Sequence, residues 1–575
     1  MMSRKLFYIV LMTSMFNVGC QKPVSNTTRE TEVATSSDQK TDRDLATQLS
    51  ELSTADLKNL RELLDETSVS EPINEHLAEI AVKLRQLTLS DADALGTRLE
   101  ALGATDSFQL ALYPVQRQAA ALESIQRVRE RLAEQHSVEI SVAGGVRFSD
   151  KKFLWLHKQT GSQVREVIGL SFACDPYDLG AEPTDVSNDD LKVLEDLTEL
   201  QFLNLEQSQI RDSGLKNLLK LRNLEYLNLS NTRITDTGLR FVAELPSLTE
   251  LKLEKTDIEG PGLGQLSKCQ NLKKLNFTDE SSVNVSSLSQ IKSLTDLWVA
   301  IEGDFEVEDL PNLKELTVHL SDSTNHPKTF RLLGMPKLEV GMIYIRNPLD
   351  ERFSIAKLPA LKQLDLSGDF DRLPFDQLGD FTNLRVLYLG SRQEQTFTRE
   401  EVQHISGLHQ LEDLALRINL EPGCLQELQD LKLLRSLELR GNDVVQELSH
   451  LGNLPDLKIL TIFGSQGAGQ GFESLQQMPK LQTVLLRQCK FDSVRFTDLP
   501  TLSRLDIRES ETRIFEVSSL PALAVLYFQG EADSLSFHDL PKLSSLGLNF
   551  HDSEKKRKIS TGELPALTKP PVNVR

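Results

Sequence analysis

Apolar residues that flank a single polar residue recur along the middle of the chain at a fixed interval. The first four such strings begin at Leu203, Leu227, Leu251 and Leu275, and each begins 24 residues after the previous one. An apolar–polar–apolar string is typical of a short strand that buries one face. The fixed interval predicts a repeated unit in which each copy packs on its neighbours.

Other positions in the stretch from Leu200 to Phe277 keep the same interval. They are Ile210, Ile234 and Ile258, then Gly214, Gly238 and Gly262, then Leu215, Leu239 and Leu263. A period of roughly 20–29 residues with this leucine spacing is typical of leucine-rich repeats, and the stretch closely resembles that family. The resemblance implies a solenoid whose exposed strand positions bind partners.

Strings of the same form continue to the end of the chain. They begin at Leu297, Leu316, Gly341, Leu364, Leu387, Leu414, Leu437, Leu460, Val484, Leu505, Leu526 and Leu546. With Leu170 and the first four, they predict roughly seventeen strands in register. The expected fold is an α/β solenoid, a horseshoe or arc with a parallel concave sheet.

The repeats are expected at residues 173–570, followed by a tail at 571–575. Pro570 and Pro571 stand where another strand would begin, and proline cannot complete a strand ladder. Early units such as 238–245 have helical spacers, so we expect helices on the convex side there. Late units shrink to steps of 21, 21 and 20 residues, which predicts extended or 3₁₀ chain instead.

Two regions precede the repeats. Residues 44–136 carry apolar residues at helical spacing, which predicts a small helical bundle whose first long helix is capped by Ser53 or Thr54. In residues 137–172 the pattern changes to strand alternation around Gly144-Gly145. This β-hairpin and first strand resemble the N-terminal cap of bacterial leucine-rich-repeat proteins, which covers the open end of the array.

The first residues resemble an export signal. In residues 1–19 a basic start precedes an apolar run that is too short to span a bilayer, as in a secretory signal peptide. The run ends in Val-Gly-Cys, which resembles the lipobox of bacterial lipoproteins and implies acylation of Cys20. The polar residues 20–43 predict a flexible tether.

The lipobox resemblance implies an exported protein that is lipid-anchored in the bacterial cell envelope. Gln21 follows the cysteine, and the family rule then favours the outer membrane. The alternative is ordinary cleavage nearby, which would leave a secreted protein.

Charge and composition exclude several classes of site. The formal charge of −20 argues against bulk binding of nucleic acid. The five cysteines are far apart and form no CxxC pair, so they predict neither a zinc site nor a disulfide framework. Cys269 aligns with Leu221 and Leu245 and is predicted to be a core residue. We expect no metal, no cofactor and no catalytic nucleophile.

The candidate ligand-binding residues are large side chains at exposed positions of the concave strands. They are Phe202, Tyr226, Trp298, His319, Tyr344, Tyr388, Arg417, Arg440, Phe463, Arg487, Arg508 and Tyr527. Exposed aromatic residues and arginines are typical anchors of protein interfaces. The family resemblance also implies that such concave positions bind a protein or peptide.

Four of these arginines occupy the same position in nearby repeats and predict a basic stripe for an acidic polymer, peptide or glycan. The alternative is that Glu438, Asp413 and Asp506 pair with the arginines across strands. For the whole chain we expect a non-catalytic binding or scaffold protein. The other hypotheses are a structural protein that acts by self-association and an effector whose activity lies in the N-terminal helices.

Overall fold

The computed structural model describes residues 45–64, 75–85, 89–104, 139–142, 146–148, 167–172 and 186–567. The last range has short gaps at 199, 283, 322–327, 347–348, 369–374, 392–395, 452–453, 552–555 and 563. Contacts divide the chain into two compact units, Met1–Val115 and Gln116–Arg575. The predicted signal peptide, tether and tail, together with Cys20 and Pro570-Pro571, lie outside the described residues.

The first unit is helical where it is described. Residues 45–50 form a helix, followed by α3 (Thr54–Leu64), α4 (Glu75–Arg85) and α5 (Leu89–Ala101). Ser53 caps α3, because its hydroxyl accepts a hydrogen bond from the Asp56 N–H at 3.2 Å. Leucines and alanines from these helices share one buried cluster. No helix in the described part of the chain has the length and apolarity needed to cross a membrane.

The first described element of the second unit is a β-hairpin. Strand β1 (Glu139–Val142) pairs antiparallel with β2 (Val146–Phe148) and with β3 (Val167–Ser171), the first strand of the repeats. The hairpin thereby covers one edge of the parallel sheet, which would otherwise expose unpaired backbone groups.

The concave sheet contains seventeen strands among the described residues, at the expected anchors. After β3 they are β4 (Phe202–Asn204), β5 (Tyr226–Asn228), β6 (Glu250–Glu254), β7 (Lys274–Ser282), β8 (Asp296–Glu302), β10 (Glu315–Ser321), β12 (Val340–Ile345), β14 (Gln363–Gly368), β15 (Val386–Ser391), β17 (Asp413–Arg417), β19 (Ser436–Arg440), β20 (Ile459–Phe463), β22 (Thr483–Arg487), β24 (Arg504–Ser518), β25 (Val525–His538) and β26 (Ser545–Phe550). All neighbours pair in parallel, from Leu170 with Leu203 to Leu526 with Leu546, so the predicted register is confirmed.

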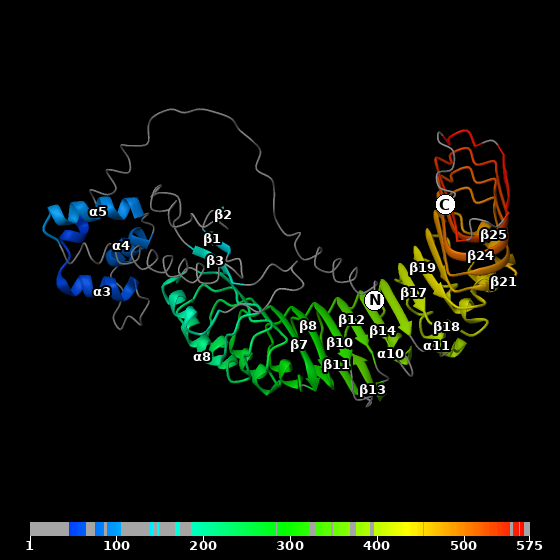
Figure 1. Cartoon of the computed structure of the whole chain (residues 1–575). Coiled ribbons are helices and arrows are strands. Elements are labelled where there is room, and N and C mark those ends of the chain that lie inside the picture. Colours follow the sequence, from blue (N-terminus) through cyan, green and yellow to red (C-terminus); the bar gives the residue numbers. More distant parts are fainter. Residues whose placement is uncertain are drawn as a thin grey trace. The chain divides into compact units, whose positions relative to one another are not determined.

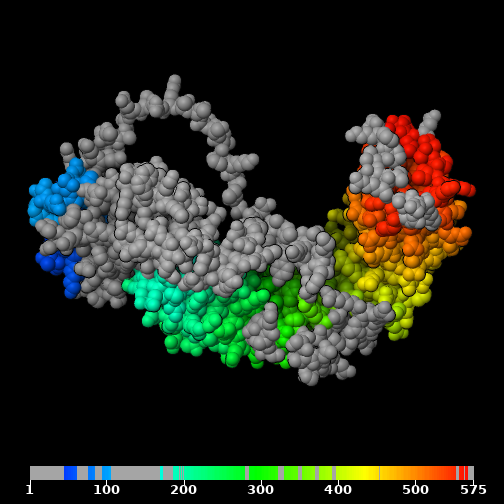
Figure 2. Space-filling view, viewed as in Figure 1, coloured from blue at the N-terminus to red at the C-terminus, as the bar shows by residue number. Residues whose placement is uncertain are grey.

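The repeats curve into an arc, with these strands on its inner side and a second layer outside (Figure 1). Successive repeats follow one another along its surface (Figure 2). One continuous cluster of buried leucines, isoleucines and phenylalanines fills the space between the layers. Burial of each such side chain contributes about 1.5–3 kcal/mol, which compensates for ordering the chain. Cys269, at 2% exposure, belongs to this cluster as predicted.

The outer layer of the first repeats is helical, as expected, but its helices are short. They are α8 (Asp212–Leu215), η2 (Lys216–Leu218), α9 (Leu239–Val242), η3 (Pro261–Lys268) and η4 (Ser286–Gln290), of which those marked η are 3₁₀. A 24-residue repeat leaves room for only one or two turns, and short turns commonly adopt 3₁₀ geometry.

The outer layer then becomes a parallel sheet in three middle repeats, which the sequence analysis did not anticipate. Its strands are β9 (Phe305–Glu308), β11 (Lys328–Leu333) and β13 (Leu349–Ala356). A short repeat does not explain β11, because 25 residues separate Leu316 from Gly341 in the repeat that contains it. Alternating apolar residues suit a strand that faces the core, and the neighbouring repeats supply its packing partners. Phe330 stacks between Phe305 and Phe353, with ring centroids 5.1 and 4.9 Å away.

The later outer layer returns to short helices and then to strands. Its elements are α10 (Phe375–Leu378), β16 (Thr396–Phe397), α11 (Arg399–Gln403), β18 (Asn419–Leu420), η5 (Cys424–Leu428), η6 (Val444–Leu451), β21 (Gln466–Gly467), η7 (Gln470–Gln477), β23 (Lys490–Thr497) and β27 (Lys558–Thr561). The second halves of β24 and β25 also belong to this layer, where they pair with β23 and β27. The extended chain predicted for the late, short repeats is therefore confirmed.

Candidate binding surface on the concave sheet

The sheet presents one face to the core and one to solvent. In β8, for example, Leu297, Val299 and Ile301 are buried, and Trp298 between them is partly exposed. Successive residues of a strand point to opposite faces, so the polar and aromatic residues between the buried ones share the open face. The predicted ligand-binding residues lie on this face.

Two aromatic residues form a stacked pair near the start of the array. Phe202 and Tyr226 are aligned on neighbouring strands, and their rings stack at 4.4 Å with an interplanar angle of 9°. Phe202 is 39% exposed, and the Lys252 ammonium lies 5.6 Å from the Tyr226 ring. Burial, followed by the charge of Glu250, raises the pKa of Tyr226. The tyrosine is therefore a neutral hydrogen-bond donor at physiological pH.

A second aromatic group crosses β8, β10 and β12. Trp298 contacts His319 edge-on at 6.0 Å, and His319 stacks on Tyr344 at 4.6 Å. Burial, with a smaller effect from the charge of Arg346, lowers the pKa of His319 to about 4. A neutral imidazole is thus held between two aromatic rings.

Two tyrosines donate hydrogen bonds to carboxylates along the sheet. The Tyr344 hydroxyl donates to Asp365 at 3.1 Å, and the Tyr388 hydroxyl donates to Asp413 at 3.0 Å. Burial raises the pKa of Asp365, although bonds from Ser367 and Tyr344 oppose that rise. Burial and the charge of Asp413 raise the pKa of Tyr388 to about 12. These pairs order the aromatic side chains and leave no tyrosinate to act as a base.

The arginine positions are aligned as predicted. Arg440, Phe463, Arg487 and Arg508 follow one another in register, and Arg417 aligns with Gly390 on the preceding strand. Arg417 forms two hydrogen bonds to the Glu438 carboxylate, at 2.5 and 3.1 Å. Arg440 is exposed and has no charged partner among the described residues.

Three arginines surround one buried carboxylate in the late repeats. Asp506 is 1% exposed, and it binds Arg508 at 2.9 and 3.1 Å, Arg504 at 2.9 Å and Arg487 at 3.4 Å. Burial would raise the pKa of Asp506, but the bonds from Arg508 and Arg504 outweigh it and hold the pKa below its ordinary value. The Arg508 guanidinium also lies over the Tyr527 ring at 4.9 Å.

The alternative of cross-strand pairing is therefore seen for two of the three carboxylates. Glu438 and Asp506 pair with Arg417 and Arg487 of the neighbouring strands. The expected partner role of Asp413 is wrong, because Asp413 accepts a hydrogen bond from the Tyr388 hydroxyl instead. Arg504 was not among the predicted residues. Its signal was present, since Arg504 and Arg508 flank Asp506 at strand spacing.

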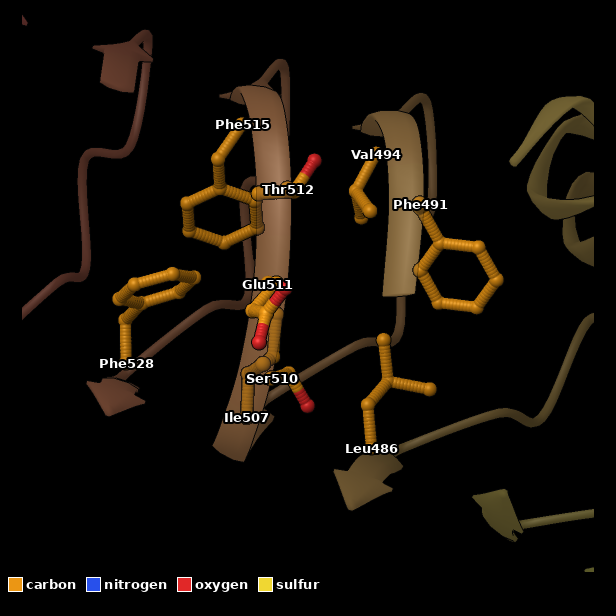
Figure 3. A pocket seen from close by; sticks show the side chains of 9 residues that line it. All are labelled: Leu486, Phe491, Val494, Ile507, Ser510, Glu511, Thr512, Phe515 and Phe528. Atoms are coloured by element: carbon orange, nitrogen blue, oxygen red, sulfur yellow. The ribbon is translucent and has the colours of Figure 1, made fainter. Parts of the chain in front are cut away.

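A small apolar gap lies inside the late repeats, at the bend between the two layers. Figure 3 shows Leu486, Phe491, Phe515 and Phe528 around it, and Ile507 of β24 also lines it. Because successive residues point to opposite faces, Asp506 and Arg508 lie on the other side of that strand. Ser510, Glu511 and Thr512 of β24 also line the gap. The gap lies on the core side of that strand, opposite to the arginines of the open face.

The described residues offer no metal centre, since none of them form a group of three or more histidine, cysteine or acidic side chains that could hold an ion. Cys269, Cys424 and Cys489 are free and buried. Burial raises the pKa of the Cys269 and Cys424 thiols to about 11. A buried, protonated thiol is a poor nucleophile.

Comparison with known proteins agrees with the architecture. Residues 190–347 match the family model described as FBD-associated F-box protein At5g56370, LRR repeats. The match covers 158 of the 575 residues. A search of curated proteins finds no match.

Several solved structures are similar to part of the chain at low identity. An internalin from Listeria monocytogenes is 19% identical with a TM-score of 0.39, and the match covers 61% of this chain and 92% of that one. A leucine-rich-repeat protein from Leptospira interrogans is 22% identical with a TM-score of 0.44, covering 62% and 91%. TLR13, solved in a complex with ssRNA13, is 18% identical with a TM-score of 0.42, covering 65% and 60%.

These similarities are low and carry no information about a ligand. The architecture follows from the chain itself, through its strand pattern, the register of the strands and the two-layer arc. The chain folds as a leucine-rich-repeat type of solenoid with a parallel concave sheet, and residues 190–347 match a leucine-rich-repeat family model.

Proposed function

We propose that this protein is a non-catalytic binding or scaffold protein that recognises a protein or peptide through its concave sheet. The observation that carries the proposal is the set of aromatic side chains on the open face. Phe202 and Tyr226 stack on each other at 4.4 Å on the solvent side of the sheet. Ordered, partly exposed aromatic rings are typical anchors of protein interfaces.

The ordering of these side chains supports a binding role. Hydrogen bonds from Tyr344 to Asp365 and from Tyr388 to Asp413 hold two rings in place before any partner arrives. Anchors that are already ordered lose less conformational entropy on association. Acidic polymers and glycans are the alternative ligand class, because arginines and aromatic rings also suit carboxylates and sugar rings. The formal charge of −20 disfavours nucleic acid.

Site-specific photo-crosslinking tests the proposal. A photoreactive amino acid replaces Tyr226, Tyr344 or Tyr527 in the full-length protein, and Arg331 or Arg495 of the outer layer in the controls. We expect one common adduct from the concave positions in extracts of cells that make the protein, and none from the controls. Equal adducts from both layers would contradict the proposal, and adducts between two copies of the chain would favour self-association.

We further propose that the protein is exported and anchored through a lipid on Cys20 in the bacterial cell envelope, with the outer membrane favoured. The sequence around Cys20 supports this, and residues 20–43 would act as the tether. Several acyl chains on one cysteine give stable membrane attachment, whereas a single chain binds only marginally.

Mass spectrometry of the mature N-terminus tests the anchor. We expect a peptide that begins at Cys20 and carries the added mass of acyl chains, and we expect a Cys20→Ala variant to lose it and leave the membrane fraction. An unmodified Cys20, or cleavage elsewhere, would favour the secreted form instead.

A further inference from the structure

The open face of β19 to β24 is basic, in a chain with a formal charge of −20. The arginines of this surface, here called the arginine patch, are Arg440, Arg487, Arg504 and Arg508. Arg417 does not belong to it, because Glu438 neutralises that side chain at 2.5 Å. Three of the four arginines, Arg487, Arg504 and Arg508, pair with the Asp506 carboxylate.

The patch retains unused hydrogen-bond donors. A guanidinium group carries five N–H donors, and Asp506 takes two from Arg508 and one each from Arg487 and Arg504. The arginine side chains are 24%, 47% and 44% exposed for Arg487, Arg504 and Arg508, so the remaining donors are reachable from solvent.

The patch also keeps a positive charge after its arginines pair with Asp506. Arg487, Arg504 and Arg508 are three cations that share this one anion, so they repel one another until a second anion binds. The buried Asp506 holds the guanidinium groups in fixed positions, which reduces the entropy lost when they bind a carboxylate. Bidentate arginine–carboxylate bonds are among the stronger hydrogen bonds in proteins.

Apolar groups lie within the patch. Phe463 is in register between Arg440 and Arg487, and the Tyr527 ring lies beneath the Arg508 guanidinium at 4.9 Å. Neighbouring strands are about 4.8 Å apart. Three such steps lead from Arg440 across Phe463 and Arg487 to Arg508, a distance of roughly 14 Å. The patch therefore presents charge, apolar surface, charge and charge in a row across the strands.

We infer that the arginine patch binds an extended peptide segment of a protein partner. This segment carries an apolar residue with one carboxylate on each side of it. An extended chain rises about 3.3 Å per residue, and alternate side chains share a face. Residues i and i+4 of such a segment are then roughly 13 Å apart, which matches the span from Arg440 to Arg508. The expected motif is acidic–x–apolar–x–acidic. This inference rests on the proposed function and specifies its partner.

Selection from a random peptide library tests the motif. A displayed library of 12-residue peptides is selected on the full-length protein, and enriched peptides are synthesised for fluorescence anisotropy. We expect enrichment of the motif, and we expect replacement of its acidic residues by Gln or Asn to weaken binding about tenfold or more. Enriched peptides without carboxylates, or amide versions that bind equally well, would overturn the inference.

Variants of the patch locate the binding. Arg440→Gln removes an exposed side chain without a described partner and should leave folding unchanged, and Arg508→Gln is the second variant. Each should weaken the selected peptide about fivefold to tenfold. The matched control is R331Q/R495Q, because both arginines lie in the outer layer and pair with partly exposed glutamates. Equal losses in the control would overturn the inference by showing a general charge effect.

Two further results separate this inference from the proposed function. A single-stranded RNA oligomer that binds as tightly as the peptide, with the same dependence on Arg440, would overturn the peptide assignment in favour of a general polyanion surface. Selected peptides could bind the patch variants as tightly as the wild type but fail to bind a Phe202→Ala/Tyr226→Ala variant. That result would leave the proposed function intact and refute the inference. If no concave substitution matters, both fail.

Discussion

The Oδ1 atom of Asp212 lies 2.5 Å from the point that a β-carbon at Gly238 would occupy. The same carboxylate accepts hydrogen bonds from the Thr235 N–H at 2.9 Å and from its hydroxyl at 2.7 Å. A β-carbon at Gly214 or at Gly262 would likewise collide with a polar side chain of the preceding repeat. Glycine recurs at this position because each repeat extends a side chain into the next one.

Substitution of Gly238 by alanine should therefore destabilise the solenoid. The added methyl group meets the Asp212 carboxylate, and overpacking of this kind costs about 1–3 kcal/mol. The denaturant midpoint of the full-length protein measures the loss. Gly407→Ala is the control, because nothing lies within 4 Å of a β-carbon there and its effect should stay small.

A double variant checks the cause of that loss. In G238A/D212A the obstructing carboxylate is absent, so the combined effect should be smaller than the sum of the two single effects. Strictly additive effects would mean that Gly238 is required for another reason.

The stability of the protein should depend on pH through His319. Its folded-state pKa is about 4, below the ordinary value of 6.5, so the unfolded chain takes up a proton first as the pH falls. The contribution of the neutral imidazole is complete above pH 6.5 and is lost as the pH falls from 6.5 towards 4. The loss should reach at most about 3 kcal/mol.

Unfolding curves at several pH values, for the wild type and His319→Gln, measure this dependence. The variant should show a smaller decrease in stability between pH 6.5 and pH 4 than the wild type. Equal slopes for both proteins would contradict a neutral, partly buried His319.

Truncation of Phe330 should mainly reduce stability, whereas truncation of Phe202 should mainly reduce partner binding. Phe330 is fully buried between two other rings, so Phe330→Ala should cost about 3–5 kcal/mol of unfolding free energy. Phe202 is 39% exposed, so Phe202→Ala should change stability far less while weakening partner binding. Denaturation midpoints and the crosslinking yield measure the two effects. A large loss of stability in the Phe202 variant would assign that ring a structural role.

Removal of the Asp506 charge should destabilise the late repeats. In Asp506→Asn three arginines remain together without their shared anion, which should cost about 2 kcal/mol because the arginines are partly exposed. Added sulfate should restore part of the loss by binding between the arginines. Asp492→Asn is the control, since Asp492 is exposed.

The acid dependence of Asp506 has a defined sign. Its folded-state pKa lies below the ordinary 3.8, so its contribution is present above pH 3.8 and is lost as the pH falls through the folded-state value. Unfolding of the wild type and Asp506→Asn should therefore converge at strongly acidic pH. A gap between the two proteins that persists at such a pH would point to a loss unrelated to charge.

The sequence alone determined the concave sheet. Buried and exposed residues alternate with a period of two, and a shift by one residue would place every leucine in solvent. The repeat interval then aligns Leu203 with Leu227 and each later anchor with the next, including Gly341. Strand register and the set of open-face positions follow from these two periods.

The tertiary structure decided the outer layer. Leu316 and Gly341 are 25 residues apart, which would accommodate a helix, yet β11 is extended because Phe330 packs between the phenylalanines of the adjacent repeats. A single repeat does not contain that information, because the stabilising contacts come from its neighbours.

The tertiary structure also decided which charges on the open face are free. Arg417, Arg487 and Arg508 were equivalent in the sequence, but Glu438 reaches the first and Asp506 binds the other two. Pairing depends on the position of individual carboxylates on adjacent strands and on their burial, which periodicity does not specify. Arg440 is exposed without a charged partner among the described residues for the same reason.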